Sequence, residues 1–281
     1  MAMCISLINM KGGVGKTTLA TQLAWYATQT KDKRVLLIDL DPQANASQAV
    51  MSPRVYSDHI NRDKPTVVNI FEQFTPPGLY RGSPIKMKPQ DVIVRRVIYK
   101  DGSLLDIVPS RLELSRTLRN PENKASLLPK FISKIEDQYD MIIIDCAPTD
   151  SMLTDAAYLC SRFILVPMKA EFLAAIGFPL LSHSLETFKL RHEDHEIDIC
   201  GLVFNDYKRG GGREYNLARQ DVEEKATDYG WYVFENGIPH SDSYYRCARD
   251  GLDIDSTKGT HGKVKDEFDA FATEFFQRIG L

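Results

Sequence analysis

The chain has 281 residues, a formal net charge of −3, 43% hydrophobic residues and 26% charged residues. These values are typical of a globular protein of one or two domains, and they exclude global disorder, a collagen-like repeat and a disulfide-stapled miniprotein. The five cysteines are scattered without a CxxC pair, which is typical of a reducing cytosol and disfavours an iron–sulfur carrier of the kind built on cysteine pairs.

Short runs of β-branched and apolar residues recur along the chain, separated by segments long enough for helices. Near-continuous apolar runs of this length are typical of strands buried on both faces. Their alternation with helices predicts an α/β fold: a doubly wound, mostly parallel sheet with helices on both faces. One such sheet would use nearly the whole chain, so we expect a single domain over 1–281. The runs are residues 4–9, 34–40, 104–108, 141–145, 163–166, 200–205 and 232–234.

The first run leads into a glycine-rich loop, NMKGGVGKTT at residues 9–18, and a helical pattern follows directly. Glycines let backbone N–H groups curl toward phosphate oxygens, and the helix N-terminus adds its positive dipole end. In this P-loop context we expect Lys16 to reach the β- and γ-phosphates of ATP, Thr17 to ligate Mg²⁺ and Thr18 to bond the α-phosphate. The other expected ATP-binding residues of the loop are Lys11, Gly12, Gly13, Val14 and Gly15.

The loop departs from the standard GxxxxGK[ST] pattern, because Met10 stands where that pattern has glycine and a second lysine, Lys11, lies inside the loop. In this it resembles the deviant Walker A motif of the ParA/MinD group of P-loop ATPases. The resemblance implies an ATP-sandwich homodimer in which Lys11 reaches the partner's phosphates. A cation delivered in trans neutralises charge on the transferred phosphoryl group, so hydrolysis would depend on dimerisation.

A first carboxylate motif, DLDPQAN at residues 39–45, follows the second apolar run. Asp39 and Asp41 point the same way if the segment is extended, because residues i and i+2 of a strand share a face. The motif resembles the DxDPQxN segment of the same group, with Ala44 where the group usually has glycine. The resemblance implies that Asp41 orients the attacking water and that Asp39 lies nearer Mg²⁺ and Lys16.

A second carboxylate, Asp145, ends the apolar run at 141–145 and matches a Walker B residue that would hold Mg²⁺. Two later segments resemble those that frame the adenine base in the group, which implies that Asn205 hydrogen-bonds adenine and that Pro239 packs near it. The resemblance covers nearly the whole chain and implies a short-form ParA/Soj-type member without an N-terminal helix-turn-helix. Lys11, Lys16 and Asp41 are the catalytic candidates.

One stretch breaks the α/β rhythm. Residues 75–90 hold four prolines and two glycines together with Arg81, Lys86 and Lys88 and no acid, so we expect a basic surface-loop insertion there.

The resemblance implies ATP-dependent binding to non-specific DNA, a ParB-like or other cargo adaptor, and a nucleoid-associated place in the cytoplasm. Because the net charge is −3, any contact with DNA needs a local basic patch. The resemblance further implies that the protein segregates or positions a plasmid, a chromosome or a protein cargo. The candidate DNA-binding residues are Lys208, Arg209, Arg213, Arg219, Arg246 and Arg249.

The main alternative is a MinD-like membrane-associated positioning ATPase, which needs a terminal amphipathic helix with a basic polar face. Residues 263–281 do carry an apolar stripe, but three basic residues stand against four acidic ones there, which an anionic membrane would not favour. We therefore expect this segment to pack on the domain, with no stable membrane insertion. Small-molecule ligases with similar loops stay open as a further class.

Overall fold

The computed structural model describes residues 2–72, 88–119, 124–171 and 177–281. Its centre is an eight-stranded sheet in the order β3-β4-β2-β5-β1-β6-β7-β8. Every pairing is parallel except that of β3 with β4, so the predicted α/β fold with a mostly parallel sheet is confirmed. The strands are β1 (Met3–Leu7), β2 (Arg34–Leu40), β3 (Val94–Ile98), β4 (Leu104–Val108), β5 (Met141–Cys146), β6 (Phe163–Met168), β7 (Asp198–Tyr207) and β8 (Ile238–Pro239).

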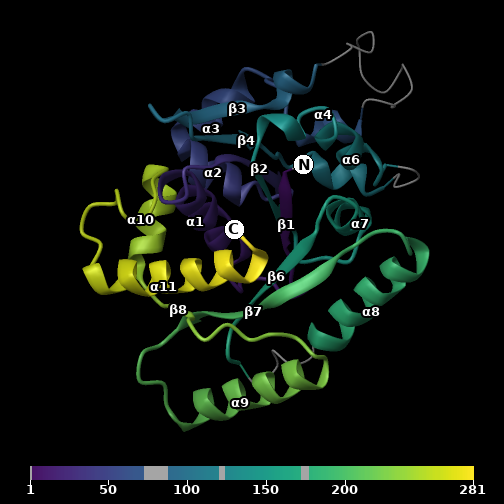
Figure 1. Ribbon diagram of the computed structural model, residues 1–281. Helices are drawn as coiled ribbons and strands as arrows, with labels where there is room; N and C mark the ends of the chain where they lie inside the picture. The colour runs from purple at the N-terminus through teal and green to yellow at the C-terminus, as the bar shows by residue number, and fades with distance from the viewer. Residues whose placement is uncertain (1, 73–87, 120–123, 172–176) are drawn as a thin grey trace.

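Helices connect the parallel strands and cover both faces of the sheet (Figure 1). The α-helices are α1 (Lys16–Gln29), α2 (Asn45–Met51), α3 (Pro53–Asn61), α4 (Val67–Phe71), α5 (Leu114–Thr117), α6 (Leu127–Ile132), α7 (Met152–Tyr158), α8 (Gly177–Arg191), α9 (Arg213–Asp228), α10 (Asp242–Asp250) and α11 (Gly262–Ile279). Among the described residues, two short 3₁₀ helices cover Pro89–Val92 and Glu136–Gln138.

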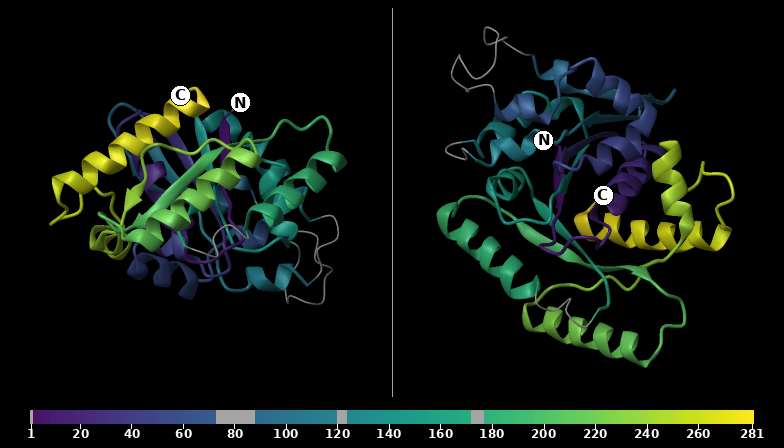
Figure 2. Two further views of the ribbon diagram at one scale, coloured as in Figure 1. Left: turned by 90° about the horizontal axis from the view of Figure 1, so that it is seen from below. Right: turned by 180° about the vertical axis from the view of Figure 1, so that it is seen from behind.

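The strand side chains divide the core into two halves, as the alternation of a strand requires. On β2, Leu36 and Ile38 pack with residues of α4, α6, α7 and α8, whereas Val35 and Leu37 pack with α1, α2, α10 and α11. Both halves are fully buried at these four positions, which explains why the run is apolar throughout instead of alternating. Figure 2 shows α9 beyond the β7 side of the sheet, at the opposite end from α3.

The strand pattern differs from the prediction in one run and at the β3 edge of the sheet. Residues 232–234 do not form a strand; only Val233 makes an isolated bridge, to Leu202. The edge strand β3 was missed because two arginines interrupt its apolar residues, and its side chains stay partly exposed. The predicted insertion at 75–90 lies outside the described residues except for its last three, which enter the 3₁₀ helix at Pro89–Val92.

The apolar stripe of the C-terminal segment packs on the domain, as expected. Val264, Phe268, Phe271, Phe275 and Ile279 of α11 are all buried in the core half that contains α1. Within the part of the chain that the structure describes, no helix combines the length and the apolar character needed to cross a bilayer.

The carboxyl ends of β1, β2 and β5 meet at one edge of the sheet. The register pairs Leu7 of β1 and Asp39 of β2 with Asp145 of β5, so three segments that are far apart in sequence end side by side. This is the edge of a parallel sheet at which ligands ordinarily bind.

Candidate functional site

The glycine-rich loop joins the end of β1 to the start of α1, as the motif predicts. Gly13 and Gly15 have φ of 71° and 88°, a left-handed conformation that glycine adopts without steric cost. Gly15 also has no room for a side chain, because a Cβ there would lie 1.8 Å from the amide nitrogen of Asn205. The loop therefore depends on glycine at both positions. At Gly15 both the backbone conformation and the lack of space for a Cβ require it.

The side chain of Lys16 curls back into the loop. Its Nζ donates to the carbonyl oxygens of Asn9, at 3.0 Å, and of Lys11, at 3.1 Å, and the residue is buried. Burial lowers the pKa of Lys16, and the negative charge of Asp145 opposes that shift. The ammonium thus lies at the centre of the loop, surrounded by backbone acceptors.

Thr17 and Asp145 are in direct contact, although they lie 128 positions apart in sequence. The Thr17 hydroxyl donates to Asp145 Oδ2 at 2.7 Å. The other carboxylate oxygen, Oδ1, is buried and finds no hydrogen-bond partner among the described residues. Burial raises the pKa of Asp145 well above its usual range, and the neighbouring Asp39 carboxylate adds to the effect.

This donor set fits a small divalent cation. Mg²⁺ takes oxygen ligands and is commonly held by one or two protein oxygens together with substrate phosphates. A hydroxyl beside a carboxylate with an unpartnered buried oxygen provides that chemistry, and the positive charge would relieve the cost of burying Asp145. Thr17 and Asp145 are the residues that would hold the ion.

Asp39 has both carboxylate oxygens engaged. Oδ2 accepts from the backbone N–H of Ser47 at 2.8 Å and from its hydroxyl at 2.6 Å, and Oδ1 accepts from the N–H of Asp41 at 3.0 Å. Burial raises the pKa of Asp39 to about 6 against these hydrogen bonds. Asp39 thereby fixes α2 to the sheet edge, and its place in an Mg²⁺ network stays a prediction.

Asp41 lies two residues after Asp39, immediately past the end of β2 at the same edge of the sheet. Its Oδ1 accepts from the N–H of Gln43 at 2.9 Å, which shapes the turn into α2. Ala44, the residue after Gln43, has φ of 55° and caps α2 in the left-handed region. That conformation gives a physical reason for the glycine usual at this position, because a Cβ is unfavourable there.

Lys11 points out of the loop and forms an ion pair with Glu171, which follows β6. Its backbone N–H donates to the Asn9 side chain at 2.8 Å, and Asn9 in turn donates to the carbonyl of Pro167 at 2.8 Å. The loop is therefore tied to the end of β6 through both backbone and side chain. Motif matching missed Glu171, because a partner 160 positions away leaves no local signal.

Asn205 lies beside the loop near the end of β7, and Pro239 ends the neighbouring strand β8. The Asn205 amide donates to the carbonyl of Val14 at 2.8 Å, so it braces the phosphate loop. Pro239 is buried and pairs with Tyr207 across the two strands. Their contacts with adenine stay predictions.

The six candidate DNA-binding residues fall into two groups. Four of them already have acceptors: Arg209 pairs with Glu267, Arg219 with Glu223, Arg249 with Asp250, and Arg246 donates to Ser243 Oγ and the Gly259 carbonyl. Lys208 and Arg213 are exposed and have no ion pair within the described ranges. Both lie at the junction between β7 and α9.

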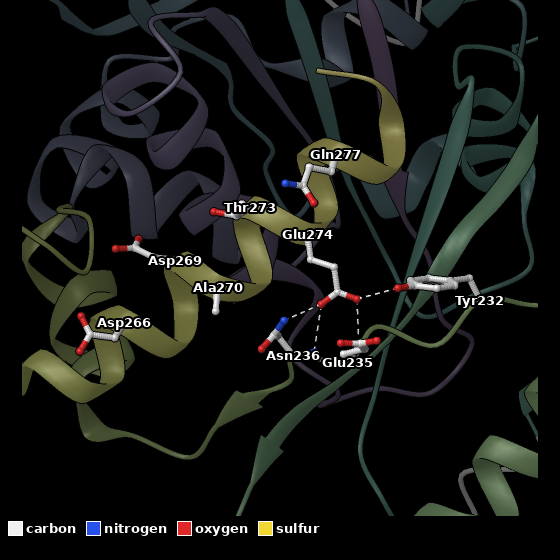
Figure 3. Close-up of a pocket in the computed structure, with 9 residues that line it drawn as sticks. All are labelled: Tyr232, Glu235, Asn236, Asp266, Asp269, Ala270, Thr273, Glu274 and Gln277. Atoms are coloured by element: carbon white, nitrogen blue, oxygen red, sulfur yellow. Dashed lines mark hydrogen bonds between the residues drawn. The ribbon is translucent and has the colours of Figure 1, made fainter.

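A hollow of about 710 Å³ lies between α11 and the segment before β8. Figure 3 shows the Glu274 carboxylate pointing at Tyr232 and Asn236. It accepts hydrogen bonds at 2.8–3.0 Å from the Tyr232 hydroxyl, the Asn236 side-chain amide and the backbone N–H groups of Glu235 and Asn236. None of the lining residues belongs to the phosphate loop or the carboxylate motifs. Glu274 is saturated by these bonds and ties the segment to α11.

Comparison with known proteins agrees with this geometry. A family model described as an AAA domain, AAA_31, matches residues 2–199. The chain belongs to that family. Within it the chain is a P-loop ATPase of the ParA/Soj partitioning type.

Two curated relatives show the resemblance along most of both chains. The chromosome partitioning protein ParA of Myxococcus xanthus is 29% identical over 254 residues, which cover 89% of this chain and 79% of that protein. The chromosome-partitioning ATPase Soj of Treponema pallidum is 27% identical over 267 residues, 91% of this chain and 90% of its own.

Solved structures share the fold at lower identity. An ATP complex of a Cyanothece McdA variant superposes with a TM-score of 0.76 at 18% identity, covering 100% of this chain and 97% of the other. Cobyrinic acid a,c-diamide synthase from Mycobacterium smegmatis, with an ATP analogue and magnesium bound, gives a TM-score of 0.67 at 20% identity over 89% and 92% of the two chains.

Proposed function

We propose that this protein is an Mg²⁺-dependent ATPase switch that dimerises around ATP, binds non-specific DNA in that state and positions a plasmid, chromosome or protein cargo through a ParB-like adaptor. The contact between Thr17 and Asp145 carries the proposal, because it joins the phosphate loop to the Walker B carboxylate beside a buried, unpartnered oxygen. The names of the two partitioning relatives and the ATP bound in the McdA structure support it. Cells would hold the protein in the cytoplasm, associated with the nucleoid.

The proposed roles in hydrolysis rest on the resemblance to the ParA/MinD group and agree with the position of each group. The loop amides and Lys16 hold the triphosphate, with Lys16 exchanging its present carbonyl acceptors for phosphate oxygens. Thr17 and Asp145 would hold Mg²⁺, which would supply positive charge to stabilise the phosphates. Asp41 lies within the same edge of the sheet, where its carboxylate orients the attacking water.

Lys11 completes the partner's site rather than its own. Its side chain leaves the loop at the surface, where it is 36% exposed and paired with Glu171, so a second chain can reach the ammonium only by displacing that carboxylate. A cation that arrives only with the partner makes hydrolysis conditional on dimerisation. A slow basal rate stimulated by the adaptor fits such an arrangement.

DNA binding would rest on backbone phosphates and would weaken steeply with salt. Lys208 and Arg213 are the best-placed contacts, because neither has an acidic partner to displace within the described ranges. Arg209, Arg219, Arg246 and Arg249 would first have to leave their present acceptors.

The test is binding of the purified protein to non-specific duplex DNA with ATP, with ADP and without nucleotide, across a salt series. We expect binding that requires ATP and falls as salt rises. Absence of DNA binding in every state would overturn the DNA-binding part of the proposal. Liposomes in the same assay would then decide whether the MinD-like alternative applies.

A further inference from the structure

The Lys11 side chain has one acceptor within the described residues, the carboxylate of Glu171 in the same chain. The lysine side chain is 36% exposed and the glutamate side chain 50%, so the ion pair lies at the surface. Water can replace either partner there, and such pairs exchange at low cost. The ammonium that would serve a partner's phosphates is thus occupied within its own chain.

The backbone of Lys11 is held independently of this ion pair. Its N–H donates to Asn9, its carbonyl accepts from Lys16, and Asn9 is anchored to Pro167 at the end of β6. These contacts lie mostly inside the domain and none involves the Glu171 side chain. Loss of the Glu171 carboxylate should therefore free the Lys11 side chain without disturbing the loop.

We propose that Glu171 is a positioning residue that holds Lys11 in cis and competes with the partner's triphosphate for it. This rests on the proposed function, in which Lys11 acts across the dimer. A single carboxylate is a weaker acceptor for an ammonium than a triphosphate, so Lys11 leaves Glu171 when a partner presents ATP. Nucleotide-free chains keep the pair and stay apart.

The experiment measures dimerisation of Glu171→Gln by sedimentation velocity, with Mg²⁺ and the slowly hydrolysed analogue AMPPNP. Each dimer breaks two such pairs, so the dimer dissociation constant should fall by about three- to twentyfold relative to wild type. The gain should shrink as NaCl rises, because salt screens an exposed pair in the wild type. Glu193→Gln is the matched control, since Glu193 is exposed and has no ion pair in the described part of the chain. It should leave the constant unchanged.

A double variant separates this role from a general structural one. In a Lys11→Ala background, Glu171→Gln should have no effect, because the side chain that it holds is gone. Glu171→Asp keeps a carboxylate, so its dimer dissociation constant should lie between those of Glu171→Gln and wild type. Equal dimerisation of Glu171→Gln and wild type would overturn the proposal, and so would weaker dimerisation, which would place Glu171 in the assembled dimer instead.

The failure of the proposed function has a different signature. A wild-type chain that binds AMPPNP but sediments as a monomer at every concentration would contradict the ATP-sandwich dimer, and the role of Glu171 would fall with it. If the wild-type chain dimerises with AMPPNP and Glu171→Gln dimerises equally well, only the proposed role of Glu171 is overturned, and the ATP-sandwich dimer stands.

Discussion

The phosphate-loop edge and the basic surface near α9 and α10 use charge in different ways. At the loop, Lys16, Asp39 and Asp145 are buried together, and one oxygen of Asp145 lacks a partner among the described residues. On the surface, Arg209 and Arg249 are already paired with Glu267 and Asp250. Incompletely compensated buried charge marks a site made for a ligand, whereas a paired surface arginine is consistent with ordinary solvation.

Among substitutions that test the contrast between the buried loop and the surface, we expect Lys16→Ala to have the largest effect. Removing the ammonium would delete the charged hydrogen bonds proposed for the β- and γ-phosphates, so ATP affinity should fall by at least about 100-fold. Fluorescent-nucleotide titration measures it, with circular dichroism to confirm folding. Lys100→Ala, at an exposed turn, is the control with unchanged affinity. Near-normal affinity of Lys16→Ala would contradict the site.

The next effect is on hydrolysis rather than binding. Asp41→Ala should lower the rate of ATP hydrolysis by about 100-fold, because the water loses its orienting carboxylate, while ATP binding and dimerisation persist. Phosphate release under saturating ATP measures the rate. A wild-type rate would remove Asp41 from this role.

On the surface, we expect basic residues without an ion pair to contribute more to DNA binding than basic residues that are already paired. A Lys208→Ala/Arg213→Ala variant should lower the slope of log affinity against log salt by about two in non-specific DNA binding. Arg249→Ala should change the slope by much less, since Asp250 already neutralises that side chain. Fluorescence anisotropy across a salt series measures both, and equal effects would break the distinction.

The smallest effect concerns the strained turn after Asp41. Ala44→Gly should leave the free energy of unfolding within about 0.5 kcal/mol of wild type, because relief of the left-handed strain offsets the greater freedom of glycine. Ala49→Gly, at a right-handed helical position of α2, should cost about 1 kcal/mol. Urea denaturation compares them; equal costs would mean that Ala44 carries no strain.

The sequence predicted this site more fully than the surface because backbone rules act over short distances. A strand that ends in a carboxylate places it at the carboxyl edge of the sheet, and GKTT starts a helix, so Lys16, Thr17 and Asp145 converge without knowledge of the rest. No such rule connects Arg209 with Glu267 or Lys11 with Glu171, which are brought together only by tertiary packing.

The strands follow the same principle. Buried strands with continuous apolar runs, such as β2 and β4, were predicted to the residue. The edge strand β3 was missed, whereas the aromatic run at 232–234 was wrongly predicted as a strand. In that run Phe234 packs its ring on Phe271 and Phe275 of α11, and the backbone gains only one bridge. Partial exposure and side-chain packing decide such segments, and neither is visible in a three-residue window.

The central claim is that Thr17 and Asp145 hold Mg²⁺ together with ATP at this edge of the sheet. Isothermal titration of the wild-type chain with ATP, once with Mg²⁺ and once with EDTA, tests it most directly. We predict that removal of Mg²⁺ weakens ATP binding by at least about tenfold, because Asp145 then stands unneutralised beside the phosphates. Equal affinity in both conditions, or no binding in either, would contradict the claim.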